Sequence, residues 1–304
     1  MKALALFVMR GWSHATGVAL LTALLSPLFA PLSLVSGAVA ALVTLRNGVA
    51  DGLRVVAVAS AGTAVAALLF GQLTVGVLFA LLLWIPMLVL GIVLRHTRSL
   101  PTTVEVAVGF GALVVVFYLL RFDDPARDWA AILETMLSGL LDAQQLDDAA
   151  RQALTEAMGR WMTGALAAAF FLQTVAALLL GRWWQALLYN PGGFRVEFHA
   201  LRLHRWLAVV ALPLVAALFV DGLPDLLRYL ALPVVAAFFL QGLALTHAQL
   251  AAFAANPAWL VGVYALLTLA PPYAVTALAT AGYADAWMDF RRRADKKPGD
   301  KAGT

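Results

Sequence analysis

The side chains that could do chemistry in this 304-residue chain are few and widely spaced. There is no cysteine, and the histidines at positions 14, 96, 199, 204 and 247 lack the HxxxH or HExxH spacing of a zinc site. No Ser-His-Asp order, carboxylate pair or glycine-rich phosphate loop is present. The sequence therefore predicts a protein that is not an enzyme and that needs neither a metal ion nor a cofactor.

Polar side chains inside long apolar stretches are the next candidates, chiefly Gln173, Gln241 and His247. Within a membrane, such groups must find a hydrogen-bond partner or face a cavity, because an unpaired amide there is costly. Interhelical hydrogen bonds are the ordinary interpretation. The alternative is a pocket in which both glutamines bind a small neutral ligand, with Trp84 as a stacking wall at the same depth. A charged ligand is disfavoured, since no charged residue lies at mid-span.

The amino-acid composition indicates in which kind of secondary structure and surroundings these residues lie. Hydrophobic residues make up 62% of the chain and charged residues only 12%, with a mean hydropathy of +0.86. This is about half the charge of an ordinary soluble domain. Soluble enzymes, disordered chains and nucleic-acid-binding modules are therefore excluded. The sequence predicts an all-α, polytopic transmembrane helical bundle, surrounded by a lipid bilayer.

The number of membrane spans follows from apolar stretches of nearly 20 residues. Nine stretches qualify, some of them short: roughly 15–30, 32–45, 53–70, 75–94, 104–120, 162–180, 207–220, 229–250 and 259–281. Basic residues gather in alternate loops, which places those loops and the N-terminus in the cytoplasm. Five cations within 291–297 argue that the C-terminus is also cytoplasmic.

If both termini lie in the cytoplasm, the chain must cross the membrane an even number of times. Pro271-Pro272 should break the last stretch, which we expect to enter and return as two half-helices, leaving eight full spans. One short early segment could be re-entrant instead, and nine spans remain the alternative.

Charge divides the chain into four parts. Residues 1–122 form a five-span bundle, and 161–290 form the C-terminal spans with a basic cytoplasmic loop at 182–205. Between them, 123–160 is predicted to form acidic external amphipathic helices broken near Gly139–Asp142, since 121–160 contains eight acids and four bases. The tail, 291–304, is predicted to be disordered.

Three local features have both ordinary and functional interpretations. Glu105, three residues after Thr102, fits a helix-capping box. The segment Arg46-Asn47-Gly48 is either a cytoplasmic turn whose arginine orients the membrane topology or a contact surface for a cytoplasmic partner. Ala15, Ala19 and Ala23 form a small-residue face that suits ordinary helix packing or docking of a membrane partner.

The loop at 182–205 is the most distinctive segment. Trp183 and Trp184 should lie at the membrane interface, and Asn190-Pro191-Gly192-Gly193 is a turn signature. After the turn, apolar and polar residues alternate from 194 to 199, including Arg195, which suggests an extended or interfacial strip. Connecting loops rarely need these features, so the loop is predicted to be ordered and to contact a partner.

Three segments of the chain together resemble a known family. The segment 181–203, the Arg46-Asn47-Gly48 turn and the closing 284–291 (Ala-Asp-Ala-Trp-Met-Asp-Phe-Arg) resemble the YybS-like family of uncharacterised bacterial integral membrane proteins, over most of the chain. The family is distantly similar to the substrate-binding subunits of energy-coupling-factor vitamin transporters. This resemblance implies that the first six spans bind a small ligand and dock on a partner through Ala15, Ala19 and Ala23. The spans after 205 depart from that six-helix subunit.

The sequence thus predicts a bacterial inner-membrane protein with a transport-related, small-molecule-binding role. The alternative is a non-catalytic scaffold that recruits cytoplasmic partners through its basic loops. A membrane enzyme acting on lipid ranks third, because no acid, base or metal cluster marks either membrane face.

Overall fold

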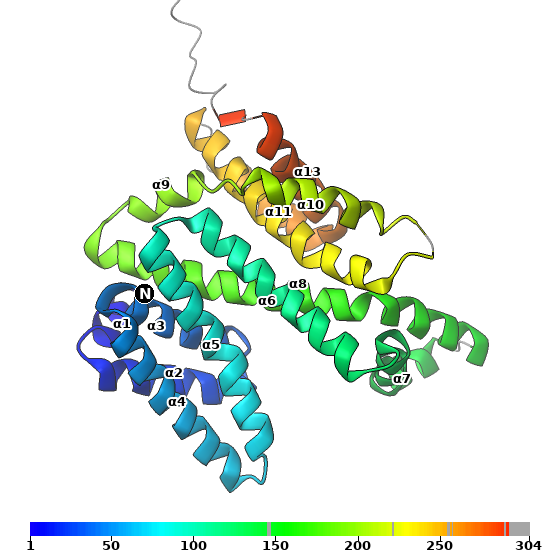
Figure 1. Cartoon of the computed structure of the whole chain (residues 1–304), viewed down its shortest axis with the longest axis horizontal. Coiled ribbons are helices and arrows are strands. Elements are labelled where there is room, and N and C mark those ends of the chain that lie inside the picture. The colour runs from blue at the N-terminus through cyan, green and yellow to red at the C-terminus, as the bar shows by residue number, and fades with distance from the viewer. Residues whose placement is uncertain (145–146, 221, 254–255, 257, 289, 292–304) are drawn as a thin grey trace, which may run out of the picture.

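The computed structural model describes residues 1–144, 147–220, 222–253, 256, 258–288 and 290–291, and every regular element within them is an α-helix (Figure 1). The all-helical prediction is confirmed. The predicted disorder of the tail concerns residues that, apart from Arg291, lie outside this description. The helices are α1 (Lys2–Val8), α2 (Trp12–Leu25), α3 (Pro31–Asn47), α4 (Val49–Leu69), α5 (Leu73–Thr97), α6 (Leu100–Arg121), α7 (Pro125–Ala143), α8 (Asp148–Tyr189), α9 (Gly193–His199), α10 (Arg205–Ala216), α11 (Asp225–Ala252), α12 (Ala258–Leu269) and α13 (Pro271–Met288).

Helix α8 is the central element of the molecule. It has 42 residues, a length of about 63 Å at the usual helical rise. It runs along the long dimension in Figure 1 and packs against α3, α7, α11 and α6. The Asp147 carboxylate accepts the backbone N–H of Ala150 at 2.7 Å and caps its start. The predicted span 162–180 is therefore the middle of a longer helix, whose first turns belong to the acidic segment.

Helix α7 lies antiparallel against the first part of α8. Asp124 caps it by accepting the backbone N–H of Arg127 at 3.1 Å, and the indole N–H of Trp129 donates to the Thr163 hydroxyl at 3.2 Å. The helix ends at Ala143, one residue beyond the predicted break near Gly139–Asp142, and α8 begins at Asp148, so the predicted break is present. Gly139 itself does not end the helix, because one exposed glycine weakens a helix without ending it.

Helix α3 is the core of the N-terminal bundle. Ten consecutive residues, from Ser36 to Leu45, are buried, because α2, α4, α5 and α8 enclose the helix. An apolar helix buried on all sides needs few polar contacts. The main one is a chain in which the indole N–H of Trp84 donates to the Ser36 hydroxyl at 3.1 Å, and that hydroxyl donates to the carbonyl oxygen of Ala19 at 2.7 Å.

The last apolar stretch forms a helical hairpin, α12 and α13, and the predicted break at Pro271-Pro272 is present. With 12 residues, α12 is about 18 Å long, too short for a hydrocarbon core of about 30 Å. Its Tyr264 hydroxyl lies 3.3 Å from His247 of α11. Arg291, just after α13, donates to the carbonyl oxygens of His199 and Leu201, at 2.7 Å each. Arg291 thus lies against the end of α9, and Leu260 and Tyr264 of α12 line a cavity together with α9 residues.

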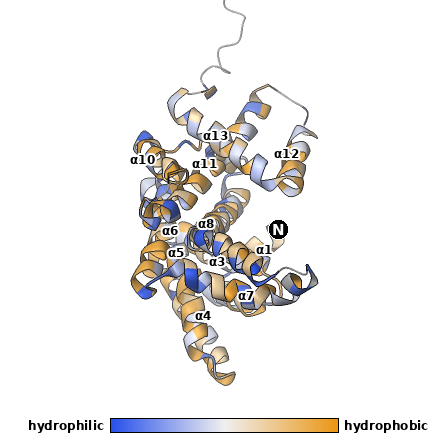
Figure 2. Ribbon diagram, turned by 90° about the vertical axis from the view of Figure 1, so that its right-hand side faces the viewer, coloured by the Kyte–Doolittle hydropathy of each residue, from blue (hydrophilic) through white to orange (hydrophobic). Residues whose placement is uncertain are grey.

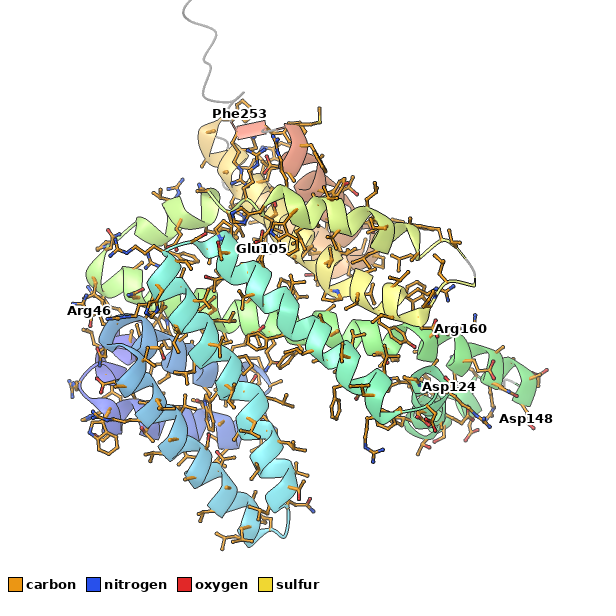
Figure 3. The ribbon with its side chains drawn as sticks, viewed as in Figure 1. Arg46, Glu105, Asp124, Asp148, Arg160 and Phe253 are labelled. Carbon is orange, nitrogen blue, oxygen red and sulfur yellow. The ribbon has the colours of Figure 1, made fainter. Side chains whose placement is uncertain are left out.

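The two ends of the molecule differ in the charge of their side chains. We call the end that holds α9 and the α3–α4 and α5–α6 turns the basic end; Arg46 and Glu105 mark it in Figure 3. We call the end that holds α7 and the start of α8 the acidic end; Asp124 and Asp148 mark it in the same view. The chain between these ends is predominantly apolar.

Five helices, α4, α5, α6, α8 and α11, are long and apolar enough to span a membrane, which is consistent with a membrane protein. α2, α3, α10 and α12 are apolar but shorter, so the count of eight or nine spans remains a prediction. Figure 2 shows α4 projecting from the body and mostly hydrophobic. Leu69 and Phe70 at its end are 80% exposed, an exposure that lipid rather than water would favour.

Candidate functional site

The segment between α8 and α10 is folded as a turn followed by a helix. The carbonyl oxygen of Asn190 accepts the N–H of Gly193 at 3.0 Å, with Pro191 second and Gly192 third at φ 88°, as in a type II turn. The turn prediction is confirmed. The predicted extended strip at 194–199 is wrong, because this stretch is α9. Phe194 and Phe198, four residues apart, stack with centroids 5.9 Å apart, a spacing that suits a helix.

Side chains from three other parts of the chain fix the backbone after α9. Arg291 binds the carbonyl oxygens of His199 and Leu201, as described above, and the Gln241 side chain of α11 accepts the N–H of Leu203 at 2.9 Å. Glu105 of α6 accepts the N–H of His204 at 2.6 Å. These bonds hold the segment in one conformation, which agrees with the expectation of an ordered loop.

Glu105 therefore has a different role from the predicted one. Its carboxylate also lies 3.0 Å from the His204 ring and accepts the indole N–H of Trp206 at 3.3 Å. The cap of α6 is Ser99, whose hydroxyl accepts the N–H of Thr102 at 3.3 Å. The capping-box prediction is wrong because the helix begins one turn earlier than the pattern suggested, leaving Glu105 free to reach the start of α10.

A buried polar cluster joins α11, α13 and this segment. Asp285 and Gln241 are fully buried, and the Gln241 amide donates to the Asp285 carboxylate at 3.1 Å. The guanidinium of Arg291 forms an ion pair with the same carboxylate at 3.2 Å. Sequence reasoning gave Asp285 and Arg291 no role. The available signal was Asp285, an acid that follows closely on the last apolar stretch, since a buried carboxylate requires a partner.

The proposed pocket of Gln173, Gln241 and Trp84 is not assembled. Gln241 is buried against Leu203 and Asp285, and Trp84 is buried against Ser36. Gln173 is exposed, and its amide reaches the Ser33 hydroxyl at 3.5 Å. The three side chains lie on different helices with different partners, so equal depth in the sequence did not mean a shared cavity.

Several of the predicted partner contacts are also internal. Ala15, Ala19 and Ala23 are fully buried, because this face of α2 packs within the bundle, and Trp184 is fully buried as well. The expectation that these four residues contact a partner is therefore wrong. Trp183 is half-buried, Asn190 forms the turn, and the Arg46 guanidinium lies 3.9 Å from the centre of the Tyr189 ring.

Two of the predicted residues do meet at a cavity. Arg195 and His247 lie at an open cavity of about 440 Å³ between α9, α11 and α12, which we call the aromatic cavity. Its other main lining residues are Phe194, Phe198, His199 and Tyr264. The sequence did not indicate the contribution of α12, which follows α11 but folds back beside its end.

The tautomer of His247 and the charge of His199 follow from the contacts of these two side chains at the cavity. Nδ1 of His247 lies 2.9 Å from the carbonyl oxygen of Leu243, so in the neutral ring Nδ1 carries the proton and Nε2 accepts the Tyr264 hydroxyl. Burial lowers the pKa of His199, and electrostatic interactions with the neighbouring Arg195, His247 and Arg291 lower it further. His199 is therefore neutral at pH 7, and Arg195 provides the permanent charge of the cavity.

The fold and this cavity define the class: an all-helical protein with five helices able to span a membrane and an aromatic cavity at its basic end. The chain matches no protein-family model, no curated protein and no solved structure. The resemblance to the YybS-like family therefore stays a prediction. Within the described ranges, no three His, Asp or Glu side chains are grouped to hold a metal ion.

Proposed function

We propose that this protein is an integral membrane protein that binds a small molecule in the aromatic cavity, in a transport-related role. The observation that supports it best is the cavity itself, which is walled by an ordered α9 on one side and by the short helix α12 on the other. The basic end faces the cytoplasm of a bacterial inner membrane in this proposal, since basic loops are retained on that side.

The lining favours a ligand with an aromatic or flat apolar body and one acidic group. Phe194, Phe198 and Tyr264 offer ring surfaces, and a volume of about 440 Å³ suits a molecule the size of a vitamin or smaller. Arg195 is exposed at the cavity and can bind a carboxylate through two parallel hydrogen bonds. This replaces the neutral ligand expected from the sequence, because the cavity lies at the charged end rather than at mid-span.

The position of α12 supports a link to transport. Helix α12 is half the length of a span, returns through α13, and lines the cavity through Leu260 and Tyr264, although none of its residues is buried. Ligand bound there touches both the hairpin and the fixed segment after α8. The distant likeness to transporter substrate-binding subunits, predicted from the sequence, agrees with such a role.

The test uses the full chain in detergent micelles and three probes: naphthalene-2-acetate, the neutral naphthalene-2-acetamide, and acetate. We expect calorimetry to show the aromatic acid binding about tenfold more tightly than the amide, and acetate not binding detectably. Arg195→Gln should abolish the difference between acid and amide. Tyr264→Ala should weaken both aromatic probes, while Tyr273→Ala, which removes an exposed tyrosine of α13, should change neither.

Equal binding of the acid by the wild type and Arg195→Gln would contradict the proposed ligand class. Absence of binding by both aromatic probes would contradict the small-molecule role. The scaffold alternative would then gain support, resting on Arg46, Asn190 and Arg195, the exposed members of the predicted contact set.

A further inference from the structure

A second cavity lies at the basic end, on a different face of α9. It has a volume of about 480 Å³ and lies between the ends of α3, α5 and α8; we call it the arginine cavity. Its lining consists of Leu45, Leu94, Arg95, Arg98, Arg182, Gln185 and Glu197. Three guanidinium groups face one carboxylate, so the lining has a net charge of about +2.

Two of the three arginines are fixed in place. Arg182 forms an ion pair with Glu197 at 2.8 Å, and their side chains are only 18% and 21% exposed. Arg95 donates to the carbonyl oxygens of Leu45 at 2.7 Å and Arg46 at 3.1 Å. These carbonyls end α3, where the helix dipole favours a cation. Both guanidinium groups are therefore positioned before any ligand arrives.

Arg98, the third arginine of the cavity, differs from the other two. It is exposed, and no carboxylate among the described residues pairs with it. It ends α5 with φ 53°, the one positive φ of a non-glycine residue in the described part of the chain. Glycine is the usual residue at such a helix end, because a side chain there is strained. The chain instead places a guanidinium at this position, beside the cavity.

We propose that the arginine cavity binds a phosphate-bearing anion. Guanidinium groups match the geometry of phosphate oxygens and donate paired hydrogen bonds to them. Gln185 adds a neutral amide donor, and Leu45 and Leu94 provide an apolar floor for the group that carries the phosphate. Glu197 reduces the repulsion among the arginines when the cavity is empty and keeps Arg182 oriented.

This anion can come from a phospholipid headgroup or from a soluble phosphate ester. A basic pocket at the end of membrane helices suits a lipid headgroup. The proposal is independent of ligand binding in the aromatic cavity, because the two cavities have no lining residue in common.

The experiment measures binding to the full chain in a neutral detergent at constant ionic strength. The probes are dioctanoyl phosphatidylglycerol, dioctanoyl phosphatidylcholine and glycerol 3-phosphate. We expect the wild type to prefer phosphatidylglycerol over phosphatidylcholine, and Arg98→Gln to weaken its binding about tenfold. Arg54→Gln is the matched control: it removes one exposed charge beside the α3–α4 turn but outside the cavity, and should leave binding unchanged.

The remaining outcomes distinguish the source or overturn the proposal. Competition by glycerol 3-phosphate at concentrations similar to the lipid would indicate a soluble ester, and its failure to compete would indicate a headgroup. Unchanged affinity in Arg98→Gln, or equal losses in Arg98→Gln and Arg54→Gln, would overturn the proposal, because binding would then follow net charge alone. Unfolding curves of both variants show whether either loss reflects misfolding.

Discussion

Asp285 is a buried carboxylate whose charge is balanced by the guanidinium of Arg291. Removing the partner of a buried ion costs about 3–5 kcal/mol, because the remaining charge is left without compensation. We therefore expect Arg291→Met to destabilise the protein by that order in denaturant unfolding in micelles. The loss should also free the carbonyl oxygens of His199 and Leu201, so the segment after α9 should become accessible to protease.

The double variant Arg291→Met with Asp285→Asn separates charge from packing. If the unpaired charge is the cause, it should recover at least half of the lost stability, since asparagine keeps a hydrogen bond to Gln241 without the charge. Equal instability of the single and double variants would show that the carbonyl bonds of Arg291 matter more than its ion pair.

His199 makes stability depend on pH. Burial, together with Arg195, His247 and Arg291, lowers its pKa below the ordinary value of 6.5, so the folded state resists protonation. A lowered pKa contributes stability above 6.5 that is lost as the pH falls through the folded-state pKa. We expect the drop in Tm between about pH 7.5 and 5.5 to be smaller in His199→Gln than in the wild type.

The control for this prediction is His96→Gln, which removes an exposed histidine at the end of α5. That variant should keep the full drop in Tm. A drop of the same size in His199→Gln would assign the pH dependence to other groups.

Among the elements, the contact between α11 and α13 depends on two glycines. A Cβ on Gly242 would overlap the backbone of Leu278, and one on Gly282 would overlap the backbone of Phe238. We expect Gly242→Val to destabilise the protein by about 1–3 kcal/mol or more, because backbone cannot move aside as a flexible side chain can. Gly262→Val on α12, where a Cβ meets nothing within 4 Å, is the control and should be nearly neutral.

Which elements the sequence predicts depends on how local their signals are. The break at Pro271-Pro272 and the turn at Asn190 were predictable, because proline and glycine determine them within a few residues. Helix α9 was missed because seven residues are too few to show a helical period. The length of α8 was missed because its pattern changes from amphipathic to fully apolar near Trp161, a change of surroundings rather than the end of a helix.

The site was less predictable than the elements, because its contacts are distant in sequence. That Gln241 needs a polar partner was predictable, but its partners, Leu203 and Asp285, lie 38 and 44 residues away. The aromatic cavity requires α12 to fold back beside α11, a placement that residue spacing alone does not specify. Composition indicated the environment of these residues, and only the packed helices determine their neighbours.

At the scale of the whole molecule, the α12–α13 hairpin predicts which segments of the chain lie on the same side of the membrane. The chain has no native cysteine, so single-cysteine variants can be labelled without background. We expect Ala200→Cys and Asn256→Cys, both at exposed positions near the basic end, to react with an impermeant thiol reagent only after the cells are opened. Ser138→Cys, exposed on α7, should react in intact cells.

Labelling of Ser138→Cys and Ala200→Cys on the same side would contradict the assignment of α8 as a span. Labelling of Asn256→Cys in intact cells, with Ala200→Cys protected, would show that α11 ends on the opposite side. In that case α12 and α13 would not form a re-entrant pair.

The uninterrupted length of α8 has a mechanical consequence. Its sequence from Asp148 to Tyr189 contains no proline, whereas α5, α10 and α11 each contain one. A straight rod of about 63 Å that pivots by about 5° at its midpoint moves each end by roughly 3 Å in opposite directions. Because α7 packs on the first part of α8, and Arg182 and Gln185 near the other end of α8 line the arginine cavity, we expect a tilt of α8 to change the width of that cavity.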